Sequence, residues 1–304
     1  MNKTYRLIIT GAQGQLGRSI QALASSYPSI EFVYTDVKEL DICEPNSLDR
    51  FAETLTPKLP TLVVNCAAYT AVDLAEGESE IADRLNHQAV RLIAESCQCL
   101  GYMMIQVSTD YVFDGAASRP YTEDAPTNPL GVYGRTKRLG EESIVQTLGS
   151  RGLVVRTAWL YSPYGRNFVL TMIRLADERK ELKVVADQIG SPTYAPNLAE
   201  AIVRIAQQSL ERGAFSRPYL HYTDAGVCSW YDLAYYAIKG SGKTKCTVLP
   251  ITTQDYPTPA ARPAYSVLSK EAIRADYDIE PRHWTDGVDS LLKHLALAGK
   301  DQTK

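Results

Sequence analysis

The residues best suited to chemistry are a tyrosine and a lysine four positions apart, Tyr133 and Lys137. They fall in a segment, Tyr133–Leu148, whose apolar spacing predicts a helix. Side chains four residues apart share a helix face, so the ammonium can approach the phenol and lower its pKa from about 10. Such a pair can exchange a proton with a substrate oxygen near neutral pH. The alternative is a packed tyrosine beside a solvated lysine.

Two hydroxyl residues, Ser108 and Thr109, follow a predicted strand over Met103–Val107. The carboxyl ends of parallel strands and the starts of the helices after them meet at one crevice, which would bring these hydroxyls to the tyrosine. The set can hold and protonate a carbonyl oxygen while a nicotinamide cofactor supplies the hydride. Tyr235 and Lys239 repeat the spacing without such hydroxyls upstream, so we assign them to packing or to the surface.

A glycine-rich run lies between a predicted strand, Arg6–Thr10, and a predicted helix, Leu16–Ser26. It reads Gly11-Ala12-Gln13-Gly14-Gln15-Leu16-Gly17. Glycines permit a tight turn and a close approach of phosphate to the backbone, and the helix N-terminus offers unpaired N–H groups. The run predicts a dinucleotide-binding loop, although a purely structural turn would contain the same glycines.

An acidic residue, Asp36, follows the second predicted strand, Glu31–Thr35. Its distance from Gly17 is close to the ~20 residues expected for an acid that binds the cofactor ribose. A carboxylate there accepts from the ribose hydroxyl and repels a 2′-phosphate, which favours NADH, but Arg18 and Lys38 nearby leave NADPH open. A turn-starting aspartate is the alternative. The predicted cofactor is therefore NADH or NADPH.

These residues lie on an alternation of short apolar runs and helical segments in the first half of the chain. The pattern also predicts strands over Thr61–Asn65 and Leu153–Arg156, and helices over Asn46–Leu55 and Ile81–Leu100. Strands that alternate with helices predict an α/β fold of the Rossmann type, a doubly wound parallel sheet with helices on both faces. Its binding crevice would lie at the carboxyl ends of the strands.

The second half of the chain is less regular and richer in tyrosine and proline, which predicts a smaller C-terminal substrate-binding lobe. We place a dinucleotide-binding domain at residues 1–160 and this lobe at residues 161–304. Its predicted elements are strands over Lys183–Val185 and Thr247–Leu249 and helices over Phe168–Glu178, Leu198–Ser209, Ser229–Lys239, Lys270–Ala275 and Thr285–Leu297. Asn197 is the expected N-cap of the second of these helices.

Composition and charge exclude several classes of protein. Of the 304 residues, 45% are apolar and 22% charged, which is typical of a globular protein and too apolar for a mainly disordered one. A net charge of −3 argues against a general nucleic-acid binder. No apolar run approaches the ~20 residues of a membrane span. The six cysteines form no C-x-x-C pair, so we expect a cytoplasmic protein with reduced, mostly buried thiols.

With these motifs in place, the chain resembles the dTDP-4-dehydrorhamnose reductase family of extended short-chain dehydrogenases/reductases. The resemblance spans nearly the whole sequence. Besides the glycine run and Tyr133-Gly134-Arg135-Thr136-Lys137, it rests on Asn65–Asp73, Ser108–Gly115, Arg156–Tyr161, Gly165–Phe168, Asp187–Thr193 and Arg262–Leu268. The segment from Ser108 and the last two are more specific than the glycine run.

The resemblance implies reduction of the C4 keto group of dTDP-4-dehydro-L-rhamnose to dTDP-L-rhamnose by NADH or NADPH. Thr109, Tyr133 and Lys137 would be catalytic, with Tyr133 as the proton donor to the C4 oxygen. The implied cofactor contacts are Gly11, Gln13, Gly14, Gln15, Leu16, Gly17, Asp36, Asp41, Ile42, Ala67, Ala68, Tyr69, Tyr133 and Lys137. The implied substrate contacts are Thr70, Val72, Ser108, Thr109, Trp159, Asn167 and Arg262.

Some of these implied roles have plainer alternatives. Trp159 can be a core aromatic, and Arg262 can form a structural ion pair instead of binding a diphosphate with its planar fork. Some relatives hold Mg²⁺ at a dimer contact through an acidic residue two places after the last glycine. Ser19 stands there, so we expect no metal at that place, and both a monomer and a homodimer remain open. Family members also return to the first lobe after entering the second, which would place residues of about 192–226 in the first.

Other functions remain open beside this reduction. A related nucleotide-sugar reductase or epimerase would use the same fold, and so would a non-catalytic regulatory subunit that resembles the β subunit of methionine adenosyltransferase. The intact set of Thr109, Tyr133 and Lys137 favours an enzyme. The expected partner is a small-molecule nucleotide sugar, with no nucleic acid and no membrane.

Overall fold

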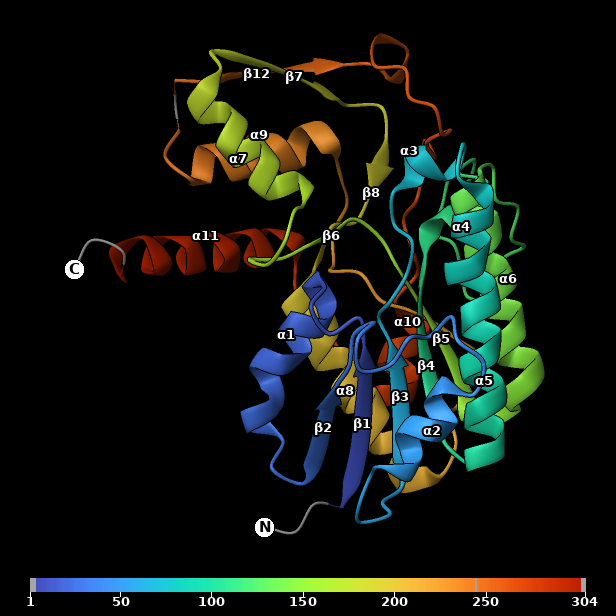
Figure 1. The fold of residues 1–304 in the computed structure, drawn as a ribbon. Helices are drawn as coiled ribbons and strands as arrows, with labels where there is room; N and C mark the ends of the chain where they lie inside the picture. Colours follow the sequence, from blue (N-terminus) through green and yellow to red (C-terminus); the bar gives the residue numbers. More distant parts are fainter. Residues whose placement is uncertain (1–3, 244, 302–304) are drawn as a thin grey trace.

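The central element of the molecule is a six-stranded parallel sheet with the order β2-β1-β3-β4-β5-β10 (Figure 1). The computed structural model describes residues 4–243 and 245–301. The strands are β1 (Tyr5–Thr10), β2 (Ile30–Tyr34), β3 (Thr61–Asn65), β4 (Met103–Thr109), β5 (Gly152–Thr157) and β10 (Tyr219–His221). The chain moves outward from β1 in one direction to β2 and then in the other to β3, which creates the crevice typical of a doubly wound sheet. The predicted Rossmann-type fold is confirmed.

Helices cover both faces of this sheet. One face carries α1 (Gln15–Leu23), α8 (Ala195–Arg212) and α10 (Glu271–Tyr277), and the other carries α2 (Ser47–Glu53), α5 (Ala89–Leu100) and α6 (Val132–Leu148). Successive side chains of a strand point to opposite faces. Leu7 and Ile9 of β1 therefore join the core under α1 and α8, while Ile8 joins the core under α5 and α6.

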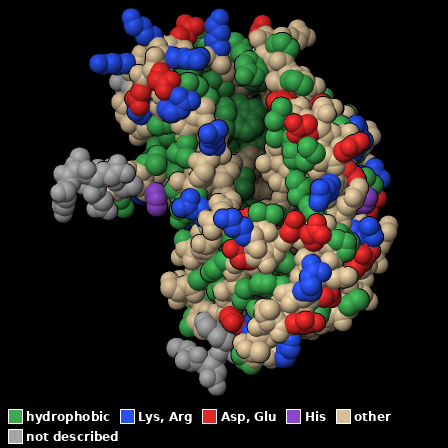
Figure 2. Space-filling model, viewed as in Figure 1, with side chains coloured by type: hydrophobic (Ala, Val, Ile, Leu, Met, Phe, Trp, Pro, Cys, Tyr) green, Lys and Arg blue, Asp and Glu red, His purple; other side chains and the backbone are tan. Residues whose placement is uncertain are grey.

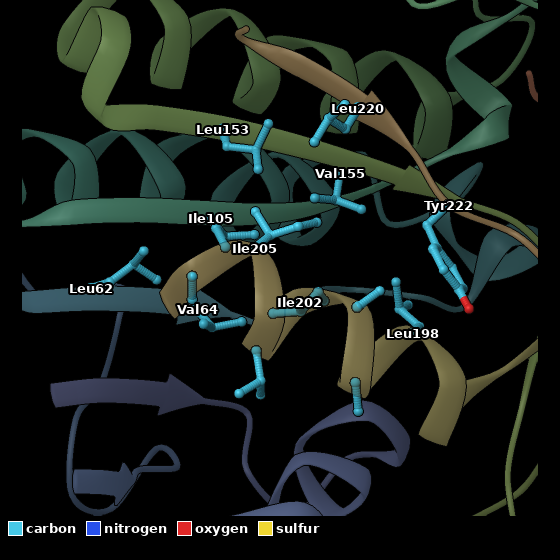
Figure 3. Close-up of a cluster of buried hydrophobic side chains, with 14 of the residues drawn as sticks. Leu62, Val64, Ile105, Leu153, Val155, Leu198, Ile202, Ile205, Leu220 and Tyr222 are labelled. Carbon is cyan, nitrogen blue, oxygen red and sulfur yellow. The ribbon is translucent and has the colours of Figure 1, made fainter. Parts of the chain in front are cut away.

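Helix α8 fills the middle of the first of these cores. In Figure 3 its side chains Leu198, Ile202 and Ile205 face strand side chains that include Val64 and Val155. All five are fully buried, and burying each such side chain stabilises the fold by about 1.5–3 kcal/mol. A segment that follows most of the sheet in the sequence is thus part of its core.

A second region lies beyond the carboxyl ends of the strands (Figure 1). Its elements are α7 (Phe168–Glu178), β7 (Glu181–Val185), α9 (Trp230–Gly240), β12 (Thr247–Ile251), α11 (Trp284–Asp301) and the short strands β6 (Leu160–Tyr161), β8 (Ile189–Gly190), β9 (Thr193–Tyr194) and β11 (Cys228–Ser229). A capping box starts α9: Ser229 Oγ accepts from Asp232 N (3.1 Å), and Asp232 Oδ2 accepts from Ser229 N (2.9 Å).

The chain crosses between the two regions more than once. After β9 it returns to the sheet with α8 and β10, then builds α9 and β12, and returns again with α10. A division at residue 160, with residues of about 192–226 rejoining the first domain, remains our proposal for the domain organisation.

The long helix predicted over Ile81–Leu100 is interrupted. A π-helical turn, Arg84–Gln88, lies between α4 (Ser79–Asp83) and α5. Within it, Asn86 Oδ1 accepts from Tyr69 N (2.9 Å) and its Nδ2 donates to Tyr69 O (3.1 Å). The turn thus aims a buried amide at the loop after β3, a tertiary requirement that apolar periodicity does not report.

One smaller prediction is wrong and another holds only in part. Asn197 is not an N-cap, because α8 begins two residues earlier at Ala195 and the Asn197 amide donates to Asp224 Oδ1 (3.0 Å). Cys99 is exposed, while three of the six cysteines are buried and two are partly buried. All six are free thiols.

Candidate active site

A cavity of about 860 Å³ lies between the carboxyl ends of β1, β3 and β4 and the second region. Figure 2 shows the hollow between the two regions, with hydrophobic side chains inside it. Nearly all residues predicted for the site line this cavity: Gly11, Gln13, Gly14, Gln15, Leu16, Gly17, Asp36, Asp41, Ile42, Ala67, Ala68, Thr70, Val72, Ser108, Thr109, Tyr133, Lys137, Trp159 and Asn167. The fold thus gathers residues from many separate segments around one space.

The glycine run forms a close-packed turn at one end of the cavity. Gly11 has φ +60°, and a Cβ atom there would lie 2.8 Å from Ala67 N. A Cβ atom on Gly17 would lie 2.6 Å from both Gly11 O and Ala12 Cα, so α1 approaches the loop backbone as only glycine permits. The first turn of α1 carries no acidic side chain, and its N–H groups can donate hydrogen bonds to phosphate oxygens.

The Asp36 carboxylate lies beside this turn. Its Oδ2 accepts a hydrogen bond from Gln13 N (3.2 Å), and its Oδ1 accepts one from Val37 N (3.0 Å). Asp41 and Ile42 line the same cavity. These features fit a dinucleotide. The loop has little side-chain bulk and leads to a free helix N-terminus, which fits the phosphates, and the acid beyond it fits the ribose.

Three buried polar residues lie at the carboxyl end of β4: Ser108, Thr109 and Asp110. Thr109 Oγ1 donates to Asp110 Oδ1 (2.9 Å) and accepts from Tyr111 N (3.2 Å). Among the described residues, neither Ser108 Oγ nor Asp110 Oδ2 has a well-formed hydrogen bond. Buried polar atoms without a partner are uncommon, and beside a cavity they suit a polar ligand.

Helix α6 brings the tyrosine–lysine pair to the same end of the cavity. Tyr133 is partly exposed there, and its ring packs edge-on against Tyr111, with centroids 5.6 Å apart. Lys137 is buried and its Nζ donates to Val107 O (2.7 Å). Thr109, Tyr133 and Lys137 therefore meet at the cavity, as a proton-transfer set requires.

The electrostatics of the pair differ from the prediction. Burial raises the pKa of Tyr133 to about 12; the neighbouring Thr109 hydroxyl opposes this rise and the Asp110 carboxylate adds to it. Burial also lowers the pKa of Lys137 to about 8, against the opposing effect of Glu141. Burial of the phenol therefore sets the direction of the shift, which is the opposite of the lowering that the spacing of the pair predicted. Tyr133 therefore keeps its proton at neutral pH, which is the state a proton donor needs.

Asp110 contributes a testable pH dependence of stability. Burial raises the pKa of this carboxyl from 3.8 to about 6, although the neighbouring Thr109 and Ser266 hydroxyls oppose the rise. Because the pKa of Asp110 is higher in the folded than in the unfolded state, its ionisation lowers the free energy of unfolding. The loss is absent below pH 4, grows as the pH rises, and is complete above pH 6. We expect Asp110→Asn to stabilise the protein by about 1–3 kcal/mol at pH 7, measured by urea unfolding.

The gain from Asp110→Asn should shrink toward zero near pH 4. Asp124 is exposed and its pKa is lowered by the Thr122 hydroxyl, so Asp124→Asn should give no gain and serves as the control. An Asp110→Asn gain that is absent at pH 7, or equal at both pH values, would contradict this account.

An apolar wall of the cavity comes from the second region. Trp159, held at φ +50°, stacks on Trp230 with ring centroids 3.6 Å apart and planes 9° apart. The Phe168 ring packs on Trp230 in turn (4.6 Å), and Leu233 lines the same cavity. The Trp159 ring thus packs on the Trp230 ring and still forms part of the cavity wall. A non-glycine residue at positive φ is uncommon and is often found at functional sites.

Two predicted residues do not line the cavity. Tyr69 donates its hydroxyl hydrogen bond to Glu78. Arg262 donates to Asp73 Oδ2 (2.7 Å), so it follows the ion-pair alternative. Asn167, by contrast, lines the cavity and also N-caps α7, where its Oδ1 accepts from Leu170 N (3.0 Å).

Sequence reasoning did not assign several lining residues to the site. The main ones are Tyr111, Arg166, Phe168, Trp230 and Leu233. Tyr111, Arg166 and Phe168 stand inside motif segments already singled out, so adjacency was an available signal. Trp230 and Leu233 carry no local signal, because only the docking of α9 brings them to the cavity.

The described part of the chain holds no group of three His, Cys, Asp or Glu side chains that could bind a metal ion. Ser19 is buried and donates to Gln15 O (2.8 Å); that no metal binds there remains a prediction. No helix within the described ranges is long and apolar enough to cross a membrane.

A model of the family described as the RmlD substrate binding domain matches residues 5–297. The chain belongs to this family. Its RmlD-type relatives include a "dTDP-4-dehydrorhamnose reductase" of Burkholderia thailandensis, 39% identical over 95% of this chain and 99% of the relative. A "probable dTDP-4,6-dihydroxy-2-methyloxan-3-one 4-ketoreductase" of Streptomyces antibioticus is 38% identical over 98% of each chain.

A solved RmlD-type structure agrees with the fold. The dTDP-4-dehydrorhamnose reductase of Bacillus anthracis, in complex with NADP, is 34% identical and superimposes with a TM-score of 0.87 over 97% of this chain and 100% of that chain. The resemblance drawn from the motifs is therefore confirmed at the level of the family. The chain is an RmlD-type oxidoreductase from a family of nicotinamide-dependent 4-ketoreductases of dTDP-sugars.

Proposed function

We propose that this protein reduces the C4 keto group of dTDP-4-dehydro-L-rhamnose to give dTDP-L-rhamnose, with NADH or NADPH as reductant. The observation that carries the proposal is the meeting of Thr109, Tyr133 and Lys137 at a cavity between a dinucleotide-type glycine loop and an apolar aromatic wall. Family membership and the printed names of the relatives at about 38% identity support the same reaction.

Tyr133 supplies the proton in this proposal. Its pKa of about 12 keeps the phenol protonated at neutral pH, and partial exposure at the cavity lets it reach a carbonyl oxygen. The reduced nicotinamide supplies a hydride to C4. As negative charge develops on the C4 oxygen, the Tyr133 proton moves to it and an alcohol forms. The resulting phenolate regains its proton from solvent before the next turnover.

Lys137 and the hydroxyls at the end of β4 position the reaction. The buried ammonium stabilises the phenolate that Tyr133 becomes, since an unpaired negative charge in this site would be costly. Ser108 Oγ, buried at the cavity, can donate to the sugar oxygen. Trp159 and Trp230 offer an apolar surface to the 6-deoxy sugar or the base.

A second candidate substrate is another dTDP-4-keto sugar. The Streptomyces antibioticus relative, named for a different 4-ketoreduction, is almost as similar to this chain as the dehydrorhamnose reductase is. The proposed site residues suit reduction of a keto group in either sugar, and which stereoisomer is accepted depends on its fit in the cavity.

A substrate panel tests the proposal. Purified protein is mixed with NADH or NADPH and with dTDP-4-dehydro-L-rhamnose, dTDP-4-dehydro-6-deoxy-D-glucose or a UDP-4-keto sugar, and cofactor oxidation is followed by absorbance. We expect the largest kcat/KM with the first compound, and dTDP-L-rhamnose as its product by NMR. A higher kcat/KM with another sugar would make that sugar the substrate in place of dTDP-4-dehydro-L-rhamnose. No oxidation with any sugar, from folded protein that binds NADH, would favour the regulatory alternative.

Asp36 is proposed to set the cofactor preference. Replacing it with alanine removes the charge that repels a 2′-phosphate and the acceptor for the ribose hydroxyl. We expect the ratio of kcat/KM for NADH to that for NADPH to fall by about 10-fold or more in Asp36→Ala. Asp124→Asn removes an exposed carboxylate elsewhere and should leave the ratio unchanged. An unchanged ratio in Asp36→Ala would remove Asp36 from the ribose site.

A further inference from the structure

The ionisable side chains that line the cavity carry little positive charge. Among the described lining residues, three are carboxylates (Asp36, Asp41 and Asp110) and two are cations (Lys137 and Arg166). A dinucleotide cofactor and a nucleotide sugar each bring a diphosphate into this space. Phosphate oxygens are bound by helix N-termini and, more strongly, by charge-assisted hydrogen bonds, so a cation near them would add to the affinity.

Two of the basic residues considered so far are already engaged. Lys137 is buried and donates to Val107 O (2.7 Å), at the catalytic end of the cavity. Arg262 is paired with Asp73 Oδ2 (2.7 Å) and does not line the cavity. Arg166 differs from both, because it lines the cavity, is exposed, and makes no hydrogen bond or ion pair within residues 4–243 and 245–301.

The loop that carries Arg166 is fixed against the glycine run. Gln15 Oε1, at the start of α1, accepts from Ser162 Oγ (2.9 Å) and from Asn167 Nδ2 (3.2 Å). The Asn167 amide also donates to Ser162 O (2.8 Å), which closes the loop on itself. These bonds join the two regions of the molecule and hold Arg166 next to Asn167, beside the place where the glycine run offers its N–H groups.

We propose that Arg166 binds a diphosphate in this cavity. The ligand is either the pyrophosphate of the cofactor at the glycine run or the diphosphate of the nucleotide sugar, and this inference rests on the proposed function. A guanidinium presents parallel donors that match two phosphate oxygens, and the backbone of its loop is already held in place, so little backbone entropy is lost when it binds.

Calorimetric titration of the full-length protein separates the two sources. Wild type and Arg166→Gln are titrated with ADP and adenosine, and then, saturated with NADH, with dTDP and thymidine. We expect the affinity for at least one diphosphate to fall about 10- to 100-fold while the matching nucleoside binds as before. A loss for ADP identifies the cofactor pyrophosphate as the ligand, and a loss for dTDP identifies the nucleotide sugar.

Controls make the outcome specific. Arg166→Lys keeps the charge without the fork and should recover part of the affinity. Arg174 lies on α7, exposed and paired with Glu178 (2.7 Å), so Arg174→Gln removes the same charge from the same region and should change nothing. Equal affinities of wild type and Arg166→Gln for both diphosphates, or an equal loss in Arg174→Gln, would overturn the inference. Failure of wild type to bind dTDP would instead count against the proposed function.

Discussion

Replacing Tyr133 with phenylalanine is expected to lower kcat by about 10²- to 10⁴-fold. The substitution removes the phenolic proton and keeps the ring that packs edge-on against Tyr111. Stability and the Kd for NADH should therefore change little, and the loss should appear in kcat. Steady-state kinetics with the preferred sugar, together with a fluorescence titration of NADH, measure the two effects separately.

A tyrosine with the same sequence spacing serves as the control for this variant. Tyr235 and Lys239 are also four residues apart, and the Lys239 ammonium lies 5.6 Å from the centre of the Tyr235 ring. Neither residue lines the cavity. Tyr235→Phe should keep its full kcat, whereas near-normal turnover by Tyr133→Phe would remove Tyr133 as the proton donor.

Replacing Gly17 with alanine is expected to weaken NADH binding by at least about 10-fold and to destabilise the fold by about 1–3 kcal/mol. The added Cβ atom would lie 2.6 Å from Gly11 O and 2.7 Å from Ala12 O, and these are backbone atoms that cannot move away by rotating a side chain. The loop must shift, and the N–H groups aimed at the phosphates shift with it. A fluorescence titration of NADH and a urea unfolding curve measure both losses.

Gly77 offers the matched control for this variant. It is exposed, and a Cβ atom there would meet only Leu74 O at 3.8 Å, an ordinary contact. Gly77→Ala should bind NADH with unchanged affinity. If Gly17→Ala did so as well, the close approach of α1 to the loop would not be needed for cofactor binding.

Local patterns predicted the parts of the molecule that depend on neighbours in the sequence. The glycine run, the strand-end hydroxyls and the spacing of Tyr133 and Lys137 are such patterns. Because a parallel sheet brings strand ends to one edge, they also predicted that these residues would meet, and Thr109, Tyr133 and Lys137 line one cavity. The sheet itself followed from alternating apolar runs and helices.

Contacts between distant segments could not be predicted in this way. Trp230 reaches Trp159 only because α9 packs among the other elements of the second region, and nothing near Trp230 in the sequence signals a cavity. The pairing of Arg262 with Asp73 depends on how the two regions face each other. The pKa of Tyr133 is raised and not lowered because the phenol is buried beside the Asp110 carboxylate, an environment that the four-residue spacing does not report.

The most direct test of the central claim follows the hydride itself. The protein is incubated with NADH deuterated at both C4 positions and with dTDP-4-dehydro-L-rhamnose, and the product is analysed by NMR and mass spectrometry. The account predicts one deuterium at C4 of the sugar and stoichiometric oxidation of the cofactor, with a far slower reaction in Tyr133→Phe. A product without deuterium at C4, or sugar conversion without net cofactor oxidation, would contradict it.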